Sequence, residues 1–310
     1  MVSFRNGSLT YVLFLIITFL IKNATVVEAS GIGKGKSNEA KINFEGYIFT
    51  PFSEKMTWLW IGSYDFRLAD KVTGEPTAFA HRIADSGLDV ISAPPCKGYY
   101  GSCEHTAPNL TPQVCDLFHS RGMIVEAAIG GTGTGERWKG KNGGWPAAKA
   151  EIDKAFEVSG GKIDAIHDGE VYHMNNHTTS EKRNYAMAYP FFKKYYEYVK
   201  NTYGKTVVFN TGTQYTAEVI MTVCDVLSVE WYGEDFMHDQ PWAKDYPASR
   251  FMSRPISYNW RGTLQQAIDD IQHHWELGYK YVGCTYNPHY ADHPFPKYYD
   301  WWDQLFSHFS

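Results

Sequence analysis

Two glutamates follow apolar, strand-like segments in the middle of the chain. Glu170 comes at the end of residues 162–170, and Glu230 at the end of residues 226–230. A half-buried carboxylate at the end of a strand costs free energy unless it is paired, so folding alone explains it poorly. Two carboxyl groups are what the cleavage of a glycosidic bond requires, one as acid and one as base or nucleophile. We therefore predict that Glu170 and Glu230 are catalytic, although the sequence does not say which one is the acid.

Further polar and aromatic residues lie beside these glutamates in the sequence. Asp168 stands two residues before Glu170, a spacing that places both on one face of a strand, and we expect it to tune or assist catalysis. Asn210 ends another strand-like run and is predicted to position a sugar hydroxyl. Aromatic walls can raise the pKa of a neighbouring carboxylic acid, and aromatic faces can stack on a sugar. The aromatic residues predicted to bind substrate are Tyr172, Trp231 and Tyr232.

The elements that must position these residues alternate between strand-like and helix-like runs joined by short loops. This rhythm predicts an α/β protein, a single (β/α)8 TIM-type barrel, whose working residues sit at the C-terminal ends of the strands. The predicted strands are 58–63, 88–93, 123–129, 162–168, 205–210, 226–230, 256–259 and 279–285. The predicted helices are 77–86, 111–121, 145–158, 181–203, 216–222 and 263–277.

The N-terminus has the pattern of a signal peptide. Arg5 precedes the apolar run 11–21, and Ala29 supplies a small residue for cleavage. The apolar run is shorter than the roughly 20 residues that a membrane helix needs. We expect residues 1–29 to be removed and the protein to be secreted to the extracellular space, with an uncleaved signal anchor as the alternative. Residues 30–45 are predicted to form a flexible tail, and residues 46–310 the barrel domain.

Composition narrows the class of partner. The net charge is −5 and there is no basic run, which argues against nucleic acid and, after signal cleavage, against a membrane surface. Aromatic residues make up 16% of the chain, which suits a polysaccharide or glycan partner but also suits a large core.

The chain has five cysteines, and a secreted protein can form disulfides. We favour a bridge between Cys96 and Cys103, which closes a loop, although Cys115 lies in the same region. Cys224 and Cys284 are expected to be free and buried.

Several segments resemble the spherulin-4-like family of secreted proteins, which includes fungal hydrolases of α-1,4-linked galactosamine polymers. The family's fourth strand reads like DGIFFDE and residues 164–170 read DAIHDGE, while its fifth reads like VVLNPGT and residues 207–213 read VVFNTGT. Its sixth strand ends in a run like VFE, which Val229-Glu230 matches. A closing run of the kind YVTDD…LPSYW is echoed by Tyr281-Val282 and residues 296–301. The similarity runs in order from about residue 122 to residue 302.

The resemblance implies an endo-acting hydrolase of an amino-sugar polysaccharide with Glu170 and Glu230 as its catalytic pair. Two departures matter. The family's Asp before the first Glu is Gly169 here, and a one-residue shift to Asp168 reverses the direction of a strand side chain. The acids of the family's eighth strand are replaced by residues 283–285 (GCT). The alternative is therefore a barrel on the cell surface or in the matrix that binds glycans without cleaving them.

A metal site is a further hypothesis. The residues His167, Asp168, Glu170, His173 and His177 are close in sequence and would suit a metal-dependent phosphodiesterase. Their spacing matches no zinc pattern, so we expect neither a metal nor a cofactor. The glycine-rich run 130–135 lacks the GK[ST] ending of a phosphate loop and is expected to be a loop of the cleft.

Overall fold

A computed structural model provides the fold. It describes residues 42–44, 47–49, 55–61, 67–96, 107–130, 144–169, 179–211, 217, 220–229, 241–256, 262–286 and 296–310. All elements named below belong to the unit Gly33–Ser310. The predicted signal peptide lies outside the described residues. At the end of the range predicted as a tail, β1 (Ile42–Phe44) pairs in antiparallel fashion with β2 (Tyr47–Phe49), which lies at the start of the predicted barrel domain.

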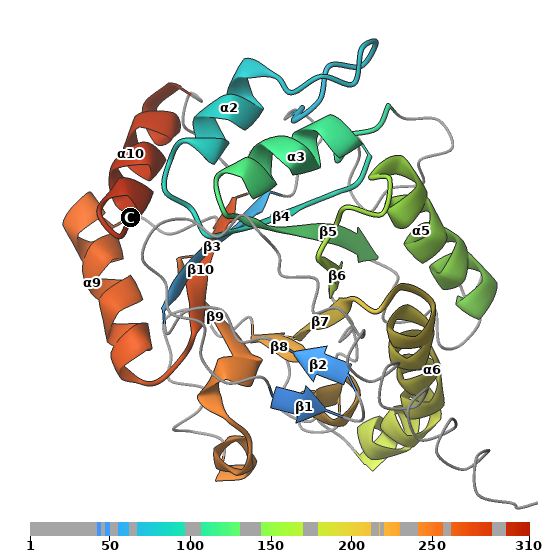
Figure 1. Cartoon of the computed structure of the whole chain (residues 1–310). Coiled ribbons are helices and arrows are strands. Elements are labelled where there is room, and N and C mark those ends of the chain that lie inside the picture. The colour runs from blue at the N-terminus through green and yellow to red at the C-terminus, as the bar shows by residue number, and fades with distance from the viewer. Residues whose placement is uncertain are drawn as a thin grey trace, which may run out of the picture. The chain divides into compact units, whose positions relative to one another are not determined.

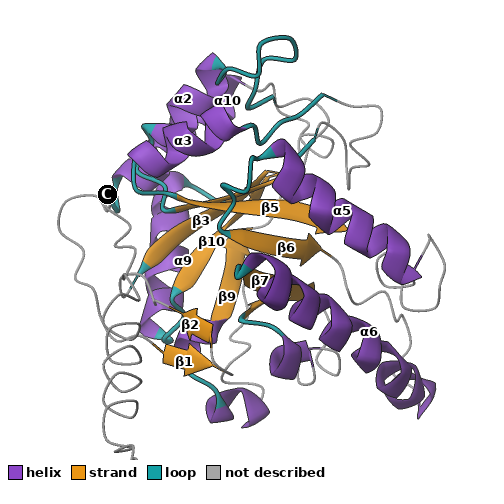
Figure 2. Ribbon diagram, turned by 45° about the vertical axis from the view of Figure 1, so that its right-hand side comes forward, coloured by secondary structure: helices purple, strands orange, loops and turns teal. Residues whose placement is uncertain are grey.

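The central feature is a closed barrel of eight parallel strands, which confirms the predicted (β/α)8 architecture. Around the barrel the order of the strands is β10-β3-β4-β5-β6-β7-β8-β9, and the helices lie outside them (Figures 1 and 2). The strands are β3 (Met56–Ile61), β4 (Val90–Ala93), β5 (Ile124–Gly130), β6 (Ala165–Gly169), β7 (Thr206–Thr211), β8 (Val226–Val229), β9 (Phe251–Ile256) and β10 (Tyr281–Tyr286).

Five helices begin within two residues of their predicted starts, namely α2, α3, α5, α6 and α9, whereas α10 was not predicted. Thr77, Thr111 and Thr263 each accept a hydrogen bond from a backbone N–H in the first turn of the helix that follows, which satisfies a donor that has no partner within the helix. No helix among the described residues is long and apolar enough to cross a bilayer. The helices are α2 (Ala78–Ala84), α3 (Pro112–Ser120), α5 (Gly144–Val158), α6 (Thr179–Tyr203), α9 (Leu264–Glu276) and α10 (Pro296–Ser307), with 3-10 turns η2 (Met221–Val223), η3 (Pro241–Asp245) and η4 (Ala248–Arg250).

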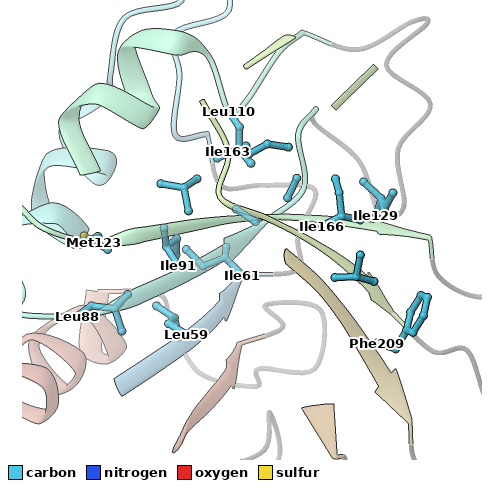
Figure 3. Close-up of a cluster of buried hydrophobic side chains, with 14 of the residues drawn as sticks. Leu59, Ile61, Leu88, Ile91, Leu110, Met123, Ile129, Ile163, Ile166 and Phe209 are labelled. Atoms are coloured by element: carbon cyan, nitrogen blue, oxygen red, sulfur yellow. The ribbon is translucent and has the colours of Figure 1, made fainter. Parts of the chain in front are cut away.

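Each strand is buried on both faces, because its side chains alternate between the barrel interior and the helical layer. The outward-facing residues form a large apolar core with the helices, part of which Figure 3 shows around Ile91, Ile129 and Phe209. The interior holds a second, smaller apolar cluster: Met56, Trp58, Trp60, Val90, Ala128, Ala165, Val208, Val226, Met252 and Tyr281.

Three aspartates fasten neighbouring strands together where β4, β6 and β8 begin. Asp89, just before β4, accepts a hydrogen bond from the Thr57 backbone N–H of β3 at 2.8 Å. Asp164, before β6, accepts from Val125 N–H of β5 at 2.9 Å, and Asp225, before β8, accepts from Val207 N–H of β7 at 2.8 Å. We call these three bonds the aspartate clamps. They tie β3 to β4, β5 to β6 and β7 to β8 in the same way.

Two of the clamp aspartates also bind a side chain of a neighbouring helix. These helices are α3, which precedes β5, and α6, which precedes β7. His119 of α3 contacts Asp164 at 2.8 Å, and Lys200 of α6 forms an ion pair with Asp225 at 2.9 Å. Asp225 additionally accepts from the hydroxyl of Tyr196, also on α6. Because Lys200 and Asp225 are both almost completely buried, either one would be an uncompensated charge without the other.

The seventh strand of the barrel, β9, lies earlier in the chain than the sequence predicted. The sequence predicted a strand at residues 256–259, whereas β9 spans Phe251–Ile256 and shares only Ile256 with that range. Arg254 and Pro255 interrupt the apolar run, which made the segment look unlike a strand. Arg254 is tolerated there because partners inside the barrel bind its guanidinium group.

The seam between β10 and β3 depends on a glycine. Gly283 stands opposite Trp58 in the register, and a Cβ atom built on Gly283 would lie 1.8 Å from the Trp58 carbonyl oxygen. The register between β10 and β9 shifts at the same place, between Val282 and Cys284. Gly283 is one of the residues that replace the acids of the resembled family's eighth strand. Here a glycine is required, because the backbones of β10 and β3 approach each other too closely for a side chain.

Among the described cysteines, Cys96 is disulfide-bonded, and Cys115, Cys224 and Cys284 are free and buried. Burial raises the pKa of the Cys115 and Cys224 thiols to about 12, so they remain protonated at neutral pH. Cys103 lies outside the described residues, and its pairing with Cys96 stays a prediction.

Replacing Asp225 should test the aspartate clamps. Asp225→Ala leaves the Lys200 ammonium buried without its anion, and we expect a loss of about 3–5 kcal/mol in the free energy of unfolding. The control is Asp116→Ala, which removes the partner of Lys162 in a pair whose side chains are 39% and 60% exposed. That pair should contribute less than about 1 kcal/mol. Equal losses in urea unfolding would contradict the role assigned to Asp225.

Gly283→Ala should destabilise the closing seam. The methyl group would collide with backbone that cannot move without breaking β3–β10 pairing, so we expect a loss of at least about 3 kcal/mol or failure to fold. Gly161→Ala is the control, because Gly161 has a φ of +77° and no atom within 4 Å of the added Cβ. It should lose only about 1–2 kcal/mol from backbone strain. Thermal unfolding of both variants makes the comparison.

Candidate active site

The predicted site residues fall into two groups. Glu170, Glu230, Tyr172, Trp231 and Tyr232 lie outside the described residues, and their roles stay predictions. Asp168 and Asn210 are described, both are almost completely buried, and they lie on neighbouring strands.

Asn210 belongs to the interior face of the barrel. Val208, two residues earlier on β7, is part of the interior cluster, whereas Phe209 belongs to the outer core. Strand alternation therefore directs Asn210 inward. Its register partner on β8 is Ser228, which also faces the interior and binds Arg254. Asn210 and Ser228 thus form a polar level near the C-terminal ends of β7 and β8.

Asp168 takes the opposite direction. Its register partners are Ile129 on β5 and Phe209 on β7, and both are residues of the outer core (Figure 3). The neighbouring His167 faces the interior, where it contacts Trp58 and Glu126. The structure therefore places Asp168 in the layer between the barrel and the helices, and it does not bring Asp168 and Asn210 to a common face.

A carboxylate lies inside the barrel where the sequence analysis named no candidate. Glu126, in the middle of β5, is 4% exposed. Its side chain lies among the residues of the interior apolar cluster. Its Oε2 atom accepts a hydrogen bond from Trp58 Nε1 at 3.2 Å and contacts His167 Nδ1 at 3.0 Å. These charge-assisted bonds compensate for the loss of water around the carboxylate.

Arg254 completes this interior network from β9. Its Nε donates to Ser228 Oγ at 3.1 Å, and one of its terminal nitrogens lies 3.3 Å from His167 Nε2. The guanidinium carbon lies 4.8 Å from the centre of the Trp58 ring, a cation–π distance. We call Trp58, Glu126, His167, Ser228 and Arg254 the interior network.

The interior network defines the protonation of His167. Arginine can only donate hydrogen bonds, so His167 Nε2 must be the acceptor in its contact with Arg254. The proton then sits on Nδ1 and is donated to Glu126. We assign His167 as a neutral imidazole that separates the positive charge of Arg254 from the negative charge of Glu126. Ser92 Oγ, at 3.2 Å from Nδ1, lies beside the same bond.

The surroundings of the interior network are apolar. Burial, and secondarily the charge of Glu126, raises the pKa of Tyr281, which lines the interior from β10. In such an environment electrostatic interactions are stronger than in water, so each charge in the network exerts a large effect on its neighbours.

Sequence reasoning could have found part of this network. A glutamate inside the apolar run 123–129 (MIVEAAI) and an arginine inside 251–256 (FMSRPI) are each improbable on a buried strand without a partner. What the sequence could not provide is their pairing, because Glu126 and Arg254 are far apart in the chain and are joined through His167 and Trp58, which both contact.

The described residues contain no group of three or more potential metal ligands. His167 and Asp168 are adjacent in sequence, but they face opposite sides of β6. The strand therefore does not present them together, as the phosphodiesterase hypothesis would require.

Comparison with known proteins supports the fold. No protein-family model and no curated protein sequence matches the chain. Among solved structures, Dispersin B aligns with a TM-score of 0.53 and 10% identity over 82% of this chain and 97% of its own. The C-terminal domain of a proposed chitinase from Desulfitobacterium hafniense DCB-2 aligns with a TM-score of 0.52 and 11% identity over 82% of this chain and all of its own. At this identity the similarity shows a shared barrel fold alone.

Removing the Glu126 carboxylate should test the interior network. Glu126→Ala leaves the Trp58 and His167 donors buried without their acceptor, and we expect a loss of about 3–5 kcal/mol in the free energy of unfolding. Glu126→Gln keeps an acceptor oxygen and should lose markedly less. Glu157→Ala, at a side chain that is 69% exposed, serves as the control and should change stability by less than about 1 kcal/mol. Similar losses for the Ala and Gln variants of Glu126 would contradict the assigned hydrogen bonds.

Proposed function

We propose that this protein is a secreted glycoside hydrolase that cleaves an amino-sugar polysaccharide internally, in the manner of the spherulin-4-like family it resembles. Glu170 and Glu230 are its catalytic carboxyl groups, and Asn210 positions a sugar hydroxyl. The observation that carries the proposal is the polar level inside the barrel near the C-terminal ends of β7, β8 and β9. There Asn210, Ser228 and Arg254 lie on neighbouring strands, at the end of the barrel where such enzymes act.

Glu230 comes directly after β8 in the sequence, two residues beyond the interior-facing Ser228. The working residues of such barrels follow the C-terminal ends of the strands. This supports Glu230 as a group that meets the sugar.

Glu170 is related differently to its strand. It follows β6 directly and stands two residues beyond the outward-facing Asp168. Its direction lies outside the described residues, which resume at α6. Asp168 is not included among the catalytic groups of this proposal, because its register partners belong to the outer core.

The chemistry requires one glutamic acid to protonate the leaving oxygen and one glutamate to activate water or attack the sugar carbon. A separation of about 5–5.5 Å between the carboxyl groups would give retention of configuration, and about 6.5–9.5 Å inversion. Tyr172, Trp231 and Tyr232 would provide the stacking surface for the sugar rings.

A second candidate function is glycan binding without cleavage. It is favoured by Gly169, which stands where the resembled family has an acid, and by the outward direction of Asp168. In that case the same polar level would bind sugar, but the acid that the family has directly before its first glutamate would be missing.

A reducing-end assay on galactosamine-, glucosamine- and galactose-based polymers tests the proposal. We expect release of oligosaccharides from an amino-sugar polymer, and a loss of about 10²–10⁴-fold in kcat for Glu230→Gln and for Glu170→Gln. Glu157→Gln on the exposed face of α5 is the matched control and should keep wild-type activity.

Each outcome has a distinct meaning. Full activity of both active-site variants on a polymer that the wild type cleaves would refute the catalytic pair. Binding to a polymer without any product would favour the glycan-binding alternative. Loss of activity on addition of a chelator would instead revive the metal-dependent hypothesis.

A further inference from the structure

We propose that folding withdraws Asn109 from N-glycosylation, because the fold uses its side-chain amide to fasten two loops of the barrel together. Residues 109–111 (NLT) form an acceptor sequon, so the sequence by itself marks Asn109 as a site for a glycan. In the folded protein the same amide is a buried structural group, and the native fold and a glycan on Asn109 exclude each other. This inference does not depend on the proposed function.

The first step is the use that the fold makes of the Asn109 side chain. Its Oδ1 atom accepts a hydrogen bond from the Leu68 backbone N–H at 2.7 Å, and its Nδ2 atom donates to the Pro94 carbonyl oxygen at 3.1 Å. Only one orientation of the amide fits, because a backbone N–H needs an acceptor and a carbonyl oxygen needs a donor. Leu68 lies between β3 and α2, and Pro94 directly follows β4. The amide therefore joins the connection after one strand to the connection after the next.

The second step is the backbone that holds Asn109 in place. The N–H groups of Asn109 and Leu110 both donate to the Pro95 carbonyl oxygen, at 2.7 and 3.1 Å. Next to them, Cys96 and Pro108 form an antiparallel bridge, and Cys96 is disulfide-bonded. The two sides of this loop therefore run side by side. Asn109 cannot turn towards solvent without breaking hydrogen bonds of both its backbone and its side chain.

The third step concerns the other two residues of the sequon. The Thr111 hydroxyl donates to the Gly74 carbonyl oxygen at 2.7 Å and accepts from the Val114 N–H in the first turn of α3. Leu110 is completely buried and belongs to the outer core, where Figure 3 labels it. The hydroxyl that completes the sequon is therefore already in use as a helix cap.

The space around the Asn109 amide leaves no room for a sugar. Glycosyl transfer breaks the bond between the sugar and its lipid pyrophosphate carrier, forms a bond from Nδ2 to the sugar carbon and releases one Nδ2 proton. Asn109 is 3% exposed, and Leu68, Pro94 and Leu110 around it are buried as well. Protein interiors are close-packed, with few voids larger than a water molecule. A sugar on Nδ2 therefore requires the two connections to separate, and a chain that receives one before folding cannot close them.

The direct test is hydrogen exchange of the Asn109 side-chain amide, followed by NMR in the full-length protein labelled with ¹⁵N-asparagine, with Asn109→Asp to identify the signal. We expect exchange at least about 100-fold slower than that of the same protons in urea-unfolded protein, because exchange requires the fold to open. Exchange as fast as in urea overturns the inference, whatever host produced the protein.

The second test is expression of the full chain in a host that N-glycosylates secreted proteins, with peptide mapping of the secreted and the cell-retained fractions. The matched control is Lys71→Asn, which creates a sequon at residues 71–73 on the same connection that Asn109 fastens. This stretch is exposed, and Val72 within it is 82% exposed. We expect carbohydrate on position 71 of the secreted variant and none on its Asn109.

The location of any Asn109 glycan decides the result. Carbohydrate on Asn109 in secreted protein that unfolds at the wild-type temperature overturns the inference. Confinement of Asn109-glycosylated chains to the cell-retained fraction supports it.

A comparison of melting temperatures tests the fastening role separately. Asn109→Asp keeps the acceptor for the Leu68 N–H but places an oxygen opposite the Pro94 carbonyl oxygen, so we expect Tm to fall by more than about 5 °C. Gln304→Glu makes the equivalent change at an exposed position of α10 and should shift Tm by less than about 2 °C. Equal shifts in the two variants would remove the basis for calling the Asn109 amide a fastening group.

Discussion

Both faces of every barrel strand are buried, so an ionisable side chain on or beside a strand must find its partner within the fold. Two sets of residues meet this requirement on opposite sides of the barrel wall. Outside, the aspartate clamps bind backbone N–H groups of the preceding strand, and Asp225 also binds Lys200. Inside, Glu126 and Arg254 are joined through His167. The first set holds the wall together, and the second holds the ionisable groups of the interior in fixed positions.

The sequence predicted most of the architecture because buried parallel strands are nearly continuous apolar runs and because three helices begin after a capping threonine. It failed at β9, where Arg254 and Pro255 break the apolar pattern. That segment is a strand because the barrel must close between β8 and β10, and because His167 and Ser228 accept hydrogen bonds from the arginine. Both conditions depend on residues distant in the chain, which no local pattern contains.

The sequence predicted which types of residue occur at the candidate site. It could not predict whether each side chain faces the barrel interior or the helical layer. Asn210 and Asp168 both occur near strand ends, and yet one faces the interior and the other the helical layer. The direction of a strand side chain reverses with a shift of one residue, which is finer than sequence reasoning can place a strand. Glu126 was missed for a related reason. It lies within a strand rather than at its end, and its value as a partner for Trp58 and His167 appears only in three dimensions.

The aspartate clamps join strands two at a time, and the last pair is built differently. At the position before β10 that Asp89, Asp164 and Asp225 occupy elsewhere, the chain has Lys280, whose backbone carbonyl oxygen accepts from Met56 N–H of β3. The pair of β9 and β10 therefore lacks an aspartate clamp, while the Lys280 carbonyl makes the same backbone bond to the next strand that the carbonyls of Asp89 and Asp164 make. Arginines fasten these last strands to β8 instead, Arg254 through Ser228 and Arg250 through the Asp225 carbonyl oxygen, so cations do for the closing part of the wall what carboxylates do for the rest.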